Sequence, residues 1–527
     1  MSLLGLPVYL CETTKMNVKN IELPLLCRAF IADNPDAFKL NQDVLNLPEK
    51  VIQFGTGVLL RGLVDYVIDA ANKKQIFNGS VVVIKSTDGN VAEFEQQDNL
   101  YTVIEQGLHL GEIVEQKHLI TCISRVLSAH DDWGEILQCA ADPSIEIVIS
   151  NTTEAGLVFV EEVFDNQTPK SFPAKLCAYL WRRYSVFNGD ENRGMVILPT
   201  ELRSHNGQLL QEFILRHADN NKLPPAFLDW VSTSNHFCNT LVDRIVPGKS
   251  EKDDLVLWDN ALSYVDHLHT KAEPYLLWAI EGNNIVKAKL PFALNDERVI
   301  IAENIAGYEE QKLRILNGSN SIVVSPAYLA GCNTLFDTVT DNLFAGYTTR
   351  LIDEEIIPTI IDQCPNARAF ADDVLDRFGN PFVQYKLLNI VLQSSSKMNS
   401  RNATTIIRYY HAYGQYPPLT LIGLASFFLF YTPKEKEGCA YYGSRDGVRY
   451  PYRDEHADFI CTALEHINWM DNDLAINAVT KILGNERIFS PELASLPELA
   501  SSVVQFCAIL KSNGIRETIA YYLNIKS

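Results

Sequence analysis

The hydrophobic positions of the chain follow two different patterns, one in each half. Between about residues 48 and 160, short β-branched runs such as "SVVVIK" alternate with amphipathic stretches such as "VLLRGLVDYVIDAANKK". Short apolar runs are typical of buried strands, and apolar positions three and four residues apart are typical of helices. Strands and helices in alternation predict a parallel sheet made of βαβ units.

The second half has the pattern of helices. After about residue 291, long periodic apolar stretches follow one another, among them "YEEQKLRILNG", "TTRLIDEEIIPTIIDQ" and "PLTLIGLASFFLFY", and the short cluster "TPKEKEG" indicates a surface loop. We predict an α/β fold in which a Rossmann-like dinucleotide-binding domain with an N-terminal extension, residues 1–290, precedes a mainly α-helical substrate-binding and catalytic domain, residues 291–527. A chain of this length is expected to form two large domains.

Composition restricts the partners. The chain has 65 acidic and 45 basic residues and a formal charge of −20, which argues against nucleic acid and anionic membranes as partners. Its eleven cysteines form no CxxC pair, its start lacks the basic segment of a signal peptide, and no uncharged stretch is long enough to cross a bilayer. We therefore expect a cytoplasmic protein, and composition gives no indication of its oligomeric state.

A glycine pair follows the first predicted strand in "VIQFGTGVLLRG". Glycines at a strand-to-helix turn let backbone N–H groups approach a pyrophosphate at the positive end of the helix dipole. The segment thus predicts cofactor contacts from Phe54, Gly55, Thr56 and Gly57, although Leu60 stands where a third glycine is usual. An ordinary strand-to-helix turn is the alternative, and the βαβ setting favours the cofactor loop.

Two further segments bear on the cofactor. An acid at the end of the second strand binds the ribose of NAD, whereas a cation there accepts the phosphate of NADP. Here "IKSTDGN" offers both Lys85 and Asp88, and we interpret it as an NAD site through Asp88, with two solvated loop residues as the alternative. In "VISNTTEAG", Asn151, Thr152 and Thr153 follow a later strand and could contact the cofactor or simply cap a helix.

The strongest candidate for chemistry is "EEQKLRILNGSN", where Asn317 follows Lys312 by five residues. A lysine partly buried among apolar neighbours is poorly solvated as a cation, so it can give or take a proton. An amide beside it can donate to a carbonyl oxygen as negative charge develops there. The alternative for Lys312 is a solvated amino group at a helix edge.

Other chemistries have weaker signals. The segment "VDHLHT" has no strong metal-ligand spacing around it, and no GxSxG elbow indicates a serine nucleophile. Hydride transfer without a metal is therefore the preferred hypothesis.

Taken in order, the motifs resemble those of a known family. "QFGTG", "SNTTEAG", "LPTEL", "HNG", "NTLVDRIVPG", "KLRILNG", "DEEIIP", "RFGNPF" and "SSSKMNSR" are similar, in order and spacing, to the long-chain polyol dehydrogenases that include mannitol dehydrogenase. The resemblance covers roughly residues 48 to 431. It implies that Lys312 is the general acid/base and Asn317 the oxyanion donor, and that Glu201, Asn239 and Asp243 contact the substrate.

The resemblance also implies a substrate class. Lys397 and Arg401 match a basic pair that would hold a substrate carboxylate. We therefore expect an NAD-dependent enzyme that interconverts D-tagaturonate and D-altronate, with reduction of fructuronate to mannonate as an alternative. A departure from the family pattern is Asn320, which occupies the place of a catalytic histidine and cannot titrate. It leaves open a third possibility, a sensor that binds NAD and a sugar acid without turnover.

Overall fold

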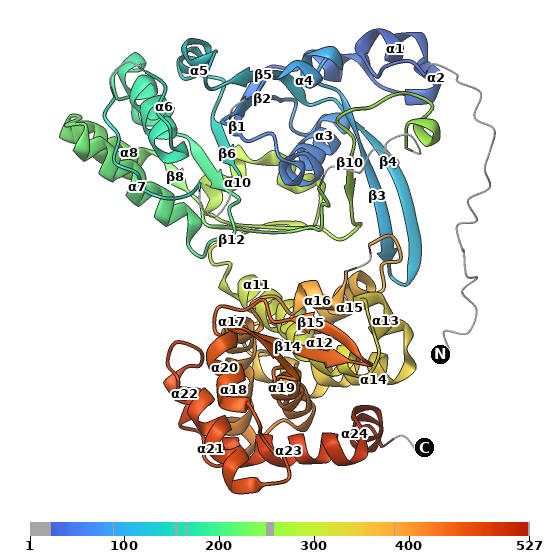
Figure 1. Ribbon diagram of the computed structural model, residues 1–527. Helices are drawn as coiled ribbons and strands as arrows, with labels where there is room; N and C mark the ends of the chain where they lie inside the picture. Colours follow the sequence, from blue (N-terminus) through green and yellow to red (C-terminus); the bar gives the residue numbers. More distant parts are fainter. Residues whose placement is uncertain are drawn as a thin grey trace.

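The computed structural model describes residues 23–87, 89–152, 156–164, 167–248, 258–383 and 385–524. Figure 1 shows an α/β part, drawn in blue and green, above a helical part, drawn in yellow to red. This arrangement confirms the predicted fold class. The predicted boundary at residue 290 stays a prediction, and strand β12 (Val299–Ala302) beyond it pairs with β11 (Leu277–Glu281) of the first part.

The α/β part is built on a six-stranded sheet in which every pair of neighbouring strands is parallel. Its spatial order is β5 (Ile123–Ser128), β2 (Ser80–Lys85), β1 (Glu49–Phe54), β6 (Ile147–Ser150), β7 (Val196–Pro199) and β8 (His236–Phe237). Phe54 lies in register with both Ile84 and Ser150, and Ser150 with Pro199. The carboxyl ends of the central strands therefore form one edge, where open α/β sheets bind their ligands.

Both faces of this sheet are buried, which explains why its strands are apolar throughout. Val81 and Val83 of β2 belong to a hydrophobic cluster on one face with helix α3 (Tyr66–Lys73), and Val82 and Ile84 belong to a cluster on the other face. Side chains alternate between faces along a strand, so a strand covered on both sides shows a continuous apolar run.

The other helices of this part frame the sheet and its loops. They are α1 (Arg28–Asp33), α2 (Pro35–Phe38), α4 (Ala92–Gln96), α5 (Trp133–Cys139), α6 (Phe172–Val186), α7 (Asn206–Asn220), α8 (Pro225–Ser234) and α10 (Asn284–Lys289). Strand β9 (Thr240–Asp243) joins β11 and β12 in a second sheet.

A long hairpin connects the two parts of the molecule. Strands β3 (Tyr101–His109) and β4 (Glu112–Ile120) pair over their whole length, and β10 (Thr270–Ala272) adds to β3. Figure 1 shows the hairpin reaching down to the helical part. There the N–H of Gly111 donates to the Asp376 carboxylate over 3.2 Å.

The helical part begins with one long helix that changes its winding in the middle. Helix α11 (Ala306–Gln311) continues into the π-helical segment η5 (Lys312–Gly318) and then into α12 (Ser319–Leu329). Helix α19 (Pro418–Phe430), buried along nearly all its length, packs against α12 and α23. An apolar helix without a polar stripe belongs in the centre of a helical domain.

The remaining helices surround this pair. They are α13 (Leu335–Thr340), α14 (Asn342–Arg350), α15 (Ala367–Phe378), α16 (Leu387–Ile390), α17 (Ser394–Lys397), α18 (Thr404–Tyr413), α20 (Ala457–Leu464), α21 (Asn472–Leu483), α22 (Pro491–Ala494), α23 (Leu499–Asn513) and α24 (Ile515–Tyr522), with π-helical segments η6 (Leu351–Ile356) and η8 (Met398–Ala403). Within the ranges described, no helix combines the length and the apolar character needed to span a membrane.

The helical part also contains a small antiparallel sheet that the sequence pattern did not predict. Its strands are β13 (Glu435–Glu437), β14 (Ala440–Arg445) and β15 (Val448–Pro451). The interpretation of "TPKEKEG" as a loop is wrong for three of its residues, which form the edge strand β13. Charged residues are common on edge strands, where they prevent further pairing.

Candidate active site

The glycine turn after β1 lines a cleft of about 580 Å³. Gly55 has a φ of +131°, and a Cβ there would lie 2.8 Å from the Leu60 side chain and 3.1 Å from the Asn151 carbonyl oxygen. Only glycine fits such a position without strain. A Cβ on Gly57 would meet nothing within 4 Å, so the chain leaves that side of the turn open. A bare backbone beside an open cleft fits a bound pyrophosphate.

The cleft brings together most of the predicted cofactor contacts. Phe54, Gly55, Thr56, Gly57, Asn151 and Thr152 line it, with Ser86 and Thr87 from the end of β2. Asp88 and Thr153 lie outside the described residues, so their predicted contacts are not tested. The Asn151 amide donates to the carbonyl and hydroxyl oxygens of Thr200, at 2.9 and 3.0 Å, and is held against the neighbouring strand.

Glu201 connects this cleft to a second cavity. One oxygen of its carboxylate accepts from the N–H of Thr152 at 2.9 Å, and the other accepts from the Ser150 hydroxyl at 3.2 Å. Burial raises the pKa of Glu201, although these donors oppose the shift. The side chain is 2% exposed and also lines the neighbouring cavity.

The second cavity has a volume of about 200 Å³ and contains the predicted catalytic pair. Lys312 and Asn317 line it from the helical part, and Glu201 lines it from the α/β part. Its other walls are Leu202, Arg203, Ser204, Thr240, Leu241, Val242, Glu309 and Leu313. The cavity therefore lies between the two parts of the molecule and next to the glycine turn cleft.

Lys312 is held in place by strand β9. Its Nζ donates to the Val242 carbonyl oxygen at 3.0 Å and lies 3.6 Å from Oδ1 of Asp243. The lysine side chain is 13% exposed, so the amino group is neither solvated as a surface lysine would be nor sealed off. A fixed amino group at the wall of a small cavity can exchange a proton with a bound molecule.

Asp243 lies behind Lys312 and does not line the cavity. Both its oxygens accept from the Arg377 guanidinium, at 2.9 Å each. Burial alone would raise the pKa of Asp243. The positive charges of Arg377 and Lys312 together have a larger effect and hold this pKa below its ordinary value. The carboxylate thus contacts Lys312 and Arg377, and its contact with substrate hydroxyls, which the family resemblance implied, stays a prediction.

The π-helical winding explains how residues five apart share one cavity. In an α-helix they would differ by about 140° around the axis. The wider turn of a π-helix, with its i→i+5 bonding, brings the fifth residue back to nearly the same side. Lys312 and Asn317 are the first and sixth residues of η5, and both face the cavity.

The predicted basic pair lies behind Asn317. Arg401 donates to the Ser321 hydroxyl at 2.9 Å and to the Asn317 carbonyl oxygen at 3.5 Å, while Lys397 donates to the Ile390 carbonyl oxygen at 2.8 Å. Burial lowers the pKa of Arg401. Among the described residues no carboxylate forms an ion pair with Arg401, and neither cation lines the cavity.

Two other predicted residues have surroundings that the sequence did not indicate. The Asn239 side chain accepts from the N–H groups of Gly207 and Gln208 at the start of α7, so it supports that helix and not the cavity wall. The Asn320 side-chain oxygen is buried and has no hydrogen-bond partner in the described parts of the chain.

Sequence reasoning missed two residues at this site. Arg377 holds Asp243, and its motif "RFGNPF" was noted without singling out the arginine. Glu309 lines the cavity one helical turn before Lys312, and burial raises its pKa. A charged residue three positions before a catalytic candidate on a helix is a signal that could have identified it.

The described residues contain no group of three or more His, Cys, Asp or Glu side chains placed to hold a metal ion.

Comparisons with known proteins agree with this geometry. The model of the mannitol dehydrogenase Rossmann domain matches residues 49–293, and that of the mannitol dehydrogenase C-terminal domain matches residues 304–510. The altronate oxidoreductase of Halalkalibacterium halodurans is 36% identical over 91% of this chain and 94% of its own. That of Bacillus subtilis is 33% identical over 92% of this chain and 98% of its own. These relatives confirm the predicted enzyme class, an oxidoreductase.

Solved structures share the fold. Pseudomonas fluorescens mannitol 2-dehydrogenase, in a ternary complex with NAD and D-mannitol, superposes with a TM-score of 0.64 at 20% identity, covering 95% of this chain and all of that one. D-sorbitol dehydrogenase gives a TM-score of 0.72 at 19% identity over 94% of this chain and 100% of that one. With both domains matched in order along one chain, the protein belongs to the mannitol dehydrogenase family.

Proposed function

We propose that the protein is an NAD-linked altronate oxidoreductase, which reduces D-tagaturonate to D-altronate. The observation that carries this proposal is the single cavity shared by Lys312 and Asn317, next to the glycine turn cleft. The named relatives at 33–36% identity support the choice of substrate.

In this proposal each residue has a defined task. NAD, when bound in the cleft, supplies the chemistry of hydride exchange. Lys312 gives a proton to the substrate oxygen during reduction and takes it back during oxidation. The Asn317 amide donates a hydrogen bond to the same oxygen, and Asp243 keeps the Lys312 amino group at the cavity wall.

Recognition of the carboxylate is proposed for Arg401. A guanidinium that is buried without an acidic partner is suited to a substrate that brings its own carboxylate. Arg401 donates to the backbone of Asn317, which lines the cavity, so a substrate carboxylate that binds Arg401 has to extend past the cavity wall at Asn317. Lys397 lies close enough to Arg401 to add to the local positive charge.

A comparison of substrates tests the proposal. The purified protein is incubated with NADH and either D-tagaturonate, D-fructuronate or neutral fructose, and NADH consumption is followed. We expect tagaturonate to be reduced fastest. A preference for fructuronate would transfer the assignment to mannonate formation, and binding of NADH without turnover of any of the three would leave a sensor, the alternative that Asn320 raises.

We also propose that the enzyme is cytoplasmic and acts without a nucleic-acid or membrane partner. The formal charge of −20 supports the second part of this proposal, because it opposes binding to nucleic acid and anionic membranes.

A further inference from the structure

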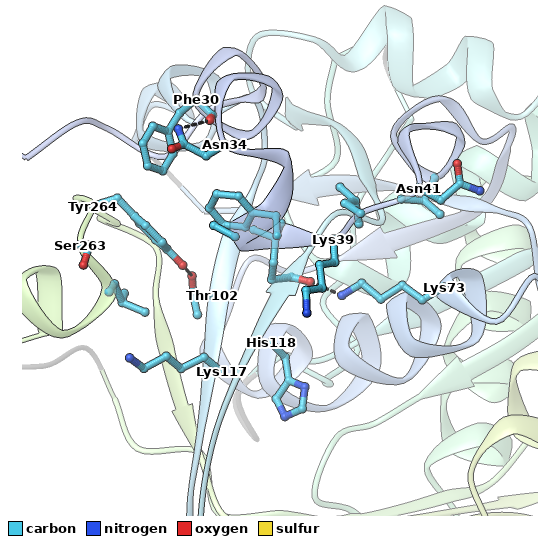
Figure 2. Close-up of a pocket in the computed structure, with 16 residues that line it drawn as sticks. Phe30, Asn34, Lys39, Asn41, Lys73, Thr102, Lys117, His118, Ser263 and Tyr264 are labelled. Carbon is cyan, nitrogen blue, oxygen red and sulfur yellow. Dashed lines mark hydrogen bonds between the residues drawn. The ribbon is translucent and has the colours of Figure 1, made fainter.

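A larger cavity lies away from the catalytic residues, under the N-terminal helices. It has a volume of about 720 Å³ and shares no lining residue with the glycine turn cleft or the catalytic cavity. Helices α1 and α2 with the segment after them cover one side, and the last residues of β4 and of α3 form the other. Figure 2 shows this arrangement.

The walls of the cavity carry an excess of positive charge. Lys39, Lys73 and Lys117 line it, and none of its described lining residues is acidic. This composition is unusual in a chain with a formal charge of −20. His118 also lies at the edge, but Figure 2 shows its ring pointing away from the lysines, so we assign it no contact.

Lys39 and Lys73 offer a place for an anion. In Figure 2 their side chains extend toward one another, Lys39 from the end of α2 and Lys73 from the end of α3. The Lys73 amino group pairs with Asp69 at 2.6 Å and donates to the Leu119 carbonyl oxygen. The Lys39 amino group has no hydrogen bond or ion pair to any described residue. Of the two cations, only Lys73 is paired with an acid in the described parts of the chain.

An aromatic wall lies beside the lysines. Phe30, Phe38 and Tyr264 contact one another with ring centroids 5.7 to 5.8 Å apart, and all three line the cavity. The Tyr264 and Thr102 hydroxyl groups form a hydrogen bond of 2.8 Å at this wall. Aromatic faces next to cations suit a ligand with an anionic end and a planar or apolar body.

From this geometry we propose that the cavity binds a phosphorylated small molecule of nucleotide size. Its phosphate lies between Lys39 and Lys73, and its organic part packs against Phe30, Phe38 and Tyr264. A volume of about 720 Å³ is within the range of sites for such ligands. The site is separate from the proposed catalytic function and does not depend on it.

Calorimetric titration of the full chain tests the proposal. NADH is present at saturation, so that the glycine turn cleft is occupied, and the probes are ADP, inorganic pyrophosphate and adenosine. We expect ADP to bind more tightly than pyrophosphate and adenosine not to bind. Lys39→Ala should weaken ADP binding at least about 10-fold, because it removes a charge-assisted hydrogen bond.

The matched control is Lys74→Ala, an exposed lysine that follows Lys73 and does not line the cavity. It should change the affinity less than about twofold. Absence of ADP binding, or an equal loss in the Lys39 and Lys74 variants, would overturn the proposal. Equal binding of ADP and pyrophosphate would overturn the part that concerns the aromatic wall, and adenosine binding as tightly as ADP would overturn the part that concerns the phosphate.

Discussion

Lys312, Asn317 and Glu201 surround one cavity, and Asp243 lies behind the lysine. The sequence identified the first three residues but did not indicate the place of Asp243, because the direction of a side chain on an edge of a mixed sheet depends on its partners in space. The partner here, Arg377, is 134 residues away along the chain.

The role of Lys312 can be tested by removing its amino group. Lys312→Ala should lower kcat by about 10²- to 10⁴-fold, the usual contribution of general acid/base catalysis. NADH affinity, measured by fluorescence titration, should stay close to that of the wild type, because the lysine does not line the glycine turn cleft. A variant that keeps more than about a tenth of the wild-type kcat would exclude Lys312 from proton transfer.

A test of the role of Arg401 requires two substrates, one with a carboxylate and one without. Arg401→Met should lower kcat/KM for the keto-uronate by about 10- to 150-fold, the equivalent of one lost charge-assisted hydrogen bond. Any slow reduction of fructose, which has no carboxylate, should remain almost unchanged. Because Arg401 also contacts the Asn317 carbonyl oxygen, an equal loss with both substrates would mean that it positions Asn317 and does not bind the carboxylate.

At the scale of elements, periodicity predicted the parallel sheet and the helical second half, but not changes of winding within a helix. The π-helical segments η5 and η8 pack against one another. A Cβ added to Gly318 would lie 3.3 Å from the Asn402 side chain and 3.5 Å from the Arg401 carbonyl oxygen, so the close contact favours glycine. A glycine also allows close packing near the cofactor turn, where a Cβ on Gly62 would lie 2.9 Å from Val246. The usual motif has its third glycine at the position of Leu60, and a local motif could not predict the contact at Gly62 because Val246 is distant in the sequence.

The glycine turn offers a matched pair of variants. Gly55→Ala should destabilise the protein by more than about 1 kcal/mol, because alanine is strained at a positive φ and its Cβ would collide with Leu60. Gly57→Ala places its Cβ in open space, so its melting temperature should equal that of the wild type while its Kd for NADH rises. Thermal melts and NADH titration measure the two effects. Unchanged NADH affinity in Gly57→Ala would show that the cofactor does not approach this turn.

At the scale of the whole molecule, a buried ionic network joins the two parts. Arg377 of α15 pairs with Asp243 of β9 and, at 2.9 Å, with Glu273 of the α/β part. Arg377→Met would leave the buried Glu273 without its cation and Asp243 with Lys312 alone, and breaking a buried ion pair typically costs about 3 to 5 kcal/mol. We expect a clear fall in melting temperature together with loss of activity.

The pair of Arg350, at the end of α14, with Glu354 of η6 lies at the surface and provides the control for this variant. Arg350→Met should change stability by less than about 1 kcal/mol, since surface ion pairs contribute little. If both variants melt together with the wild type, the network does not hold the two parts together.

The buried carboxyl group of Asp65 predicts how stability depends on pH. Asp65 accepts from the Tyr101 hydroxyl at 3.0 Å beneath the glycine turn, and burial raises its pKa from 3.8 to about 7. Between these two values the folded protein keeps a proton that the unfolded chain releases. Stability from this group is therefore complete below about pH 4 and is lost progressively as the pH rises to about 7, by up to roughly 4 kcal/mol, with no further loss above that pH. Asp65→Asn stays neutral at every pH, so its melting temperature should match that of the wild type near pH 4, exceed it increasingly from about pH 4 to 7, and exceed it by a constant amount above pH 7. Melting curves that run parallel across this range would mean that Asp65 is already ionised in the folded protein at low pH.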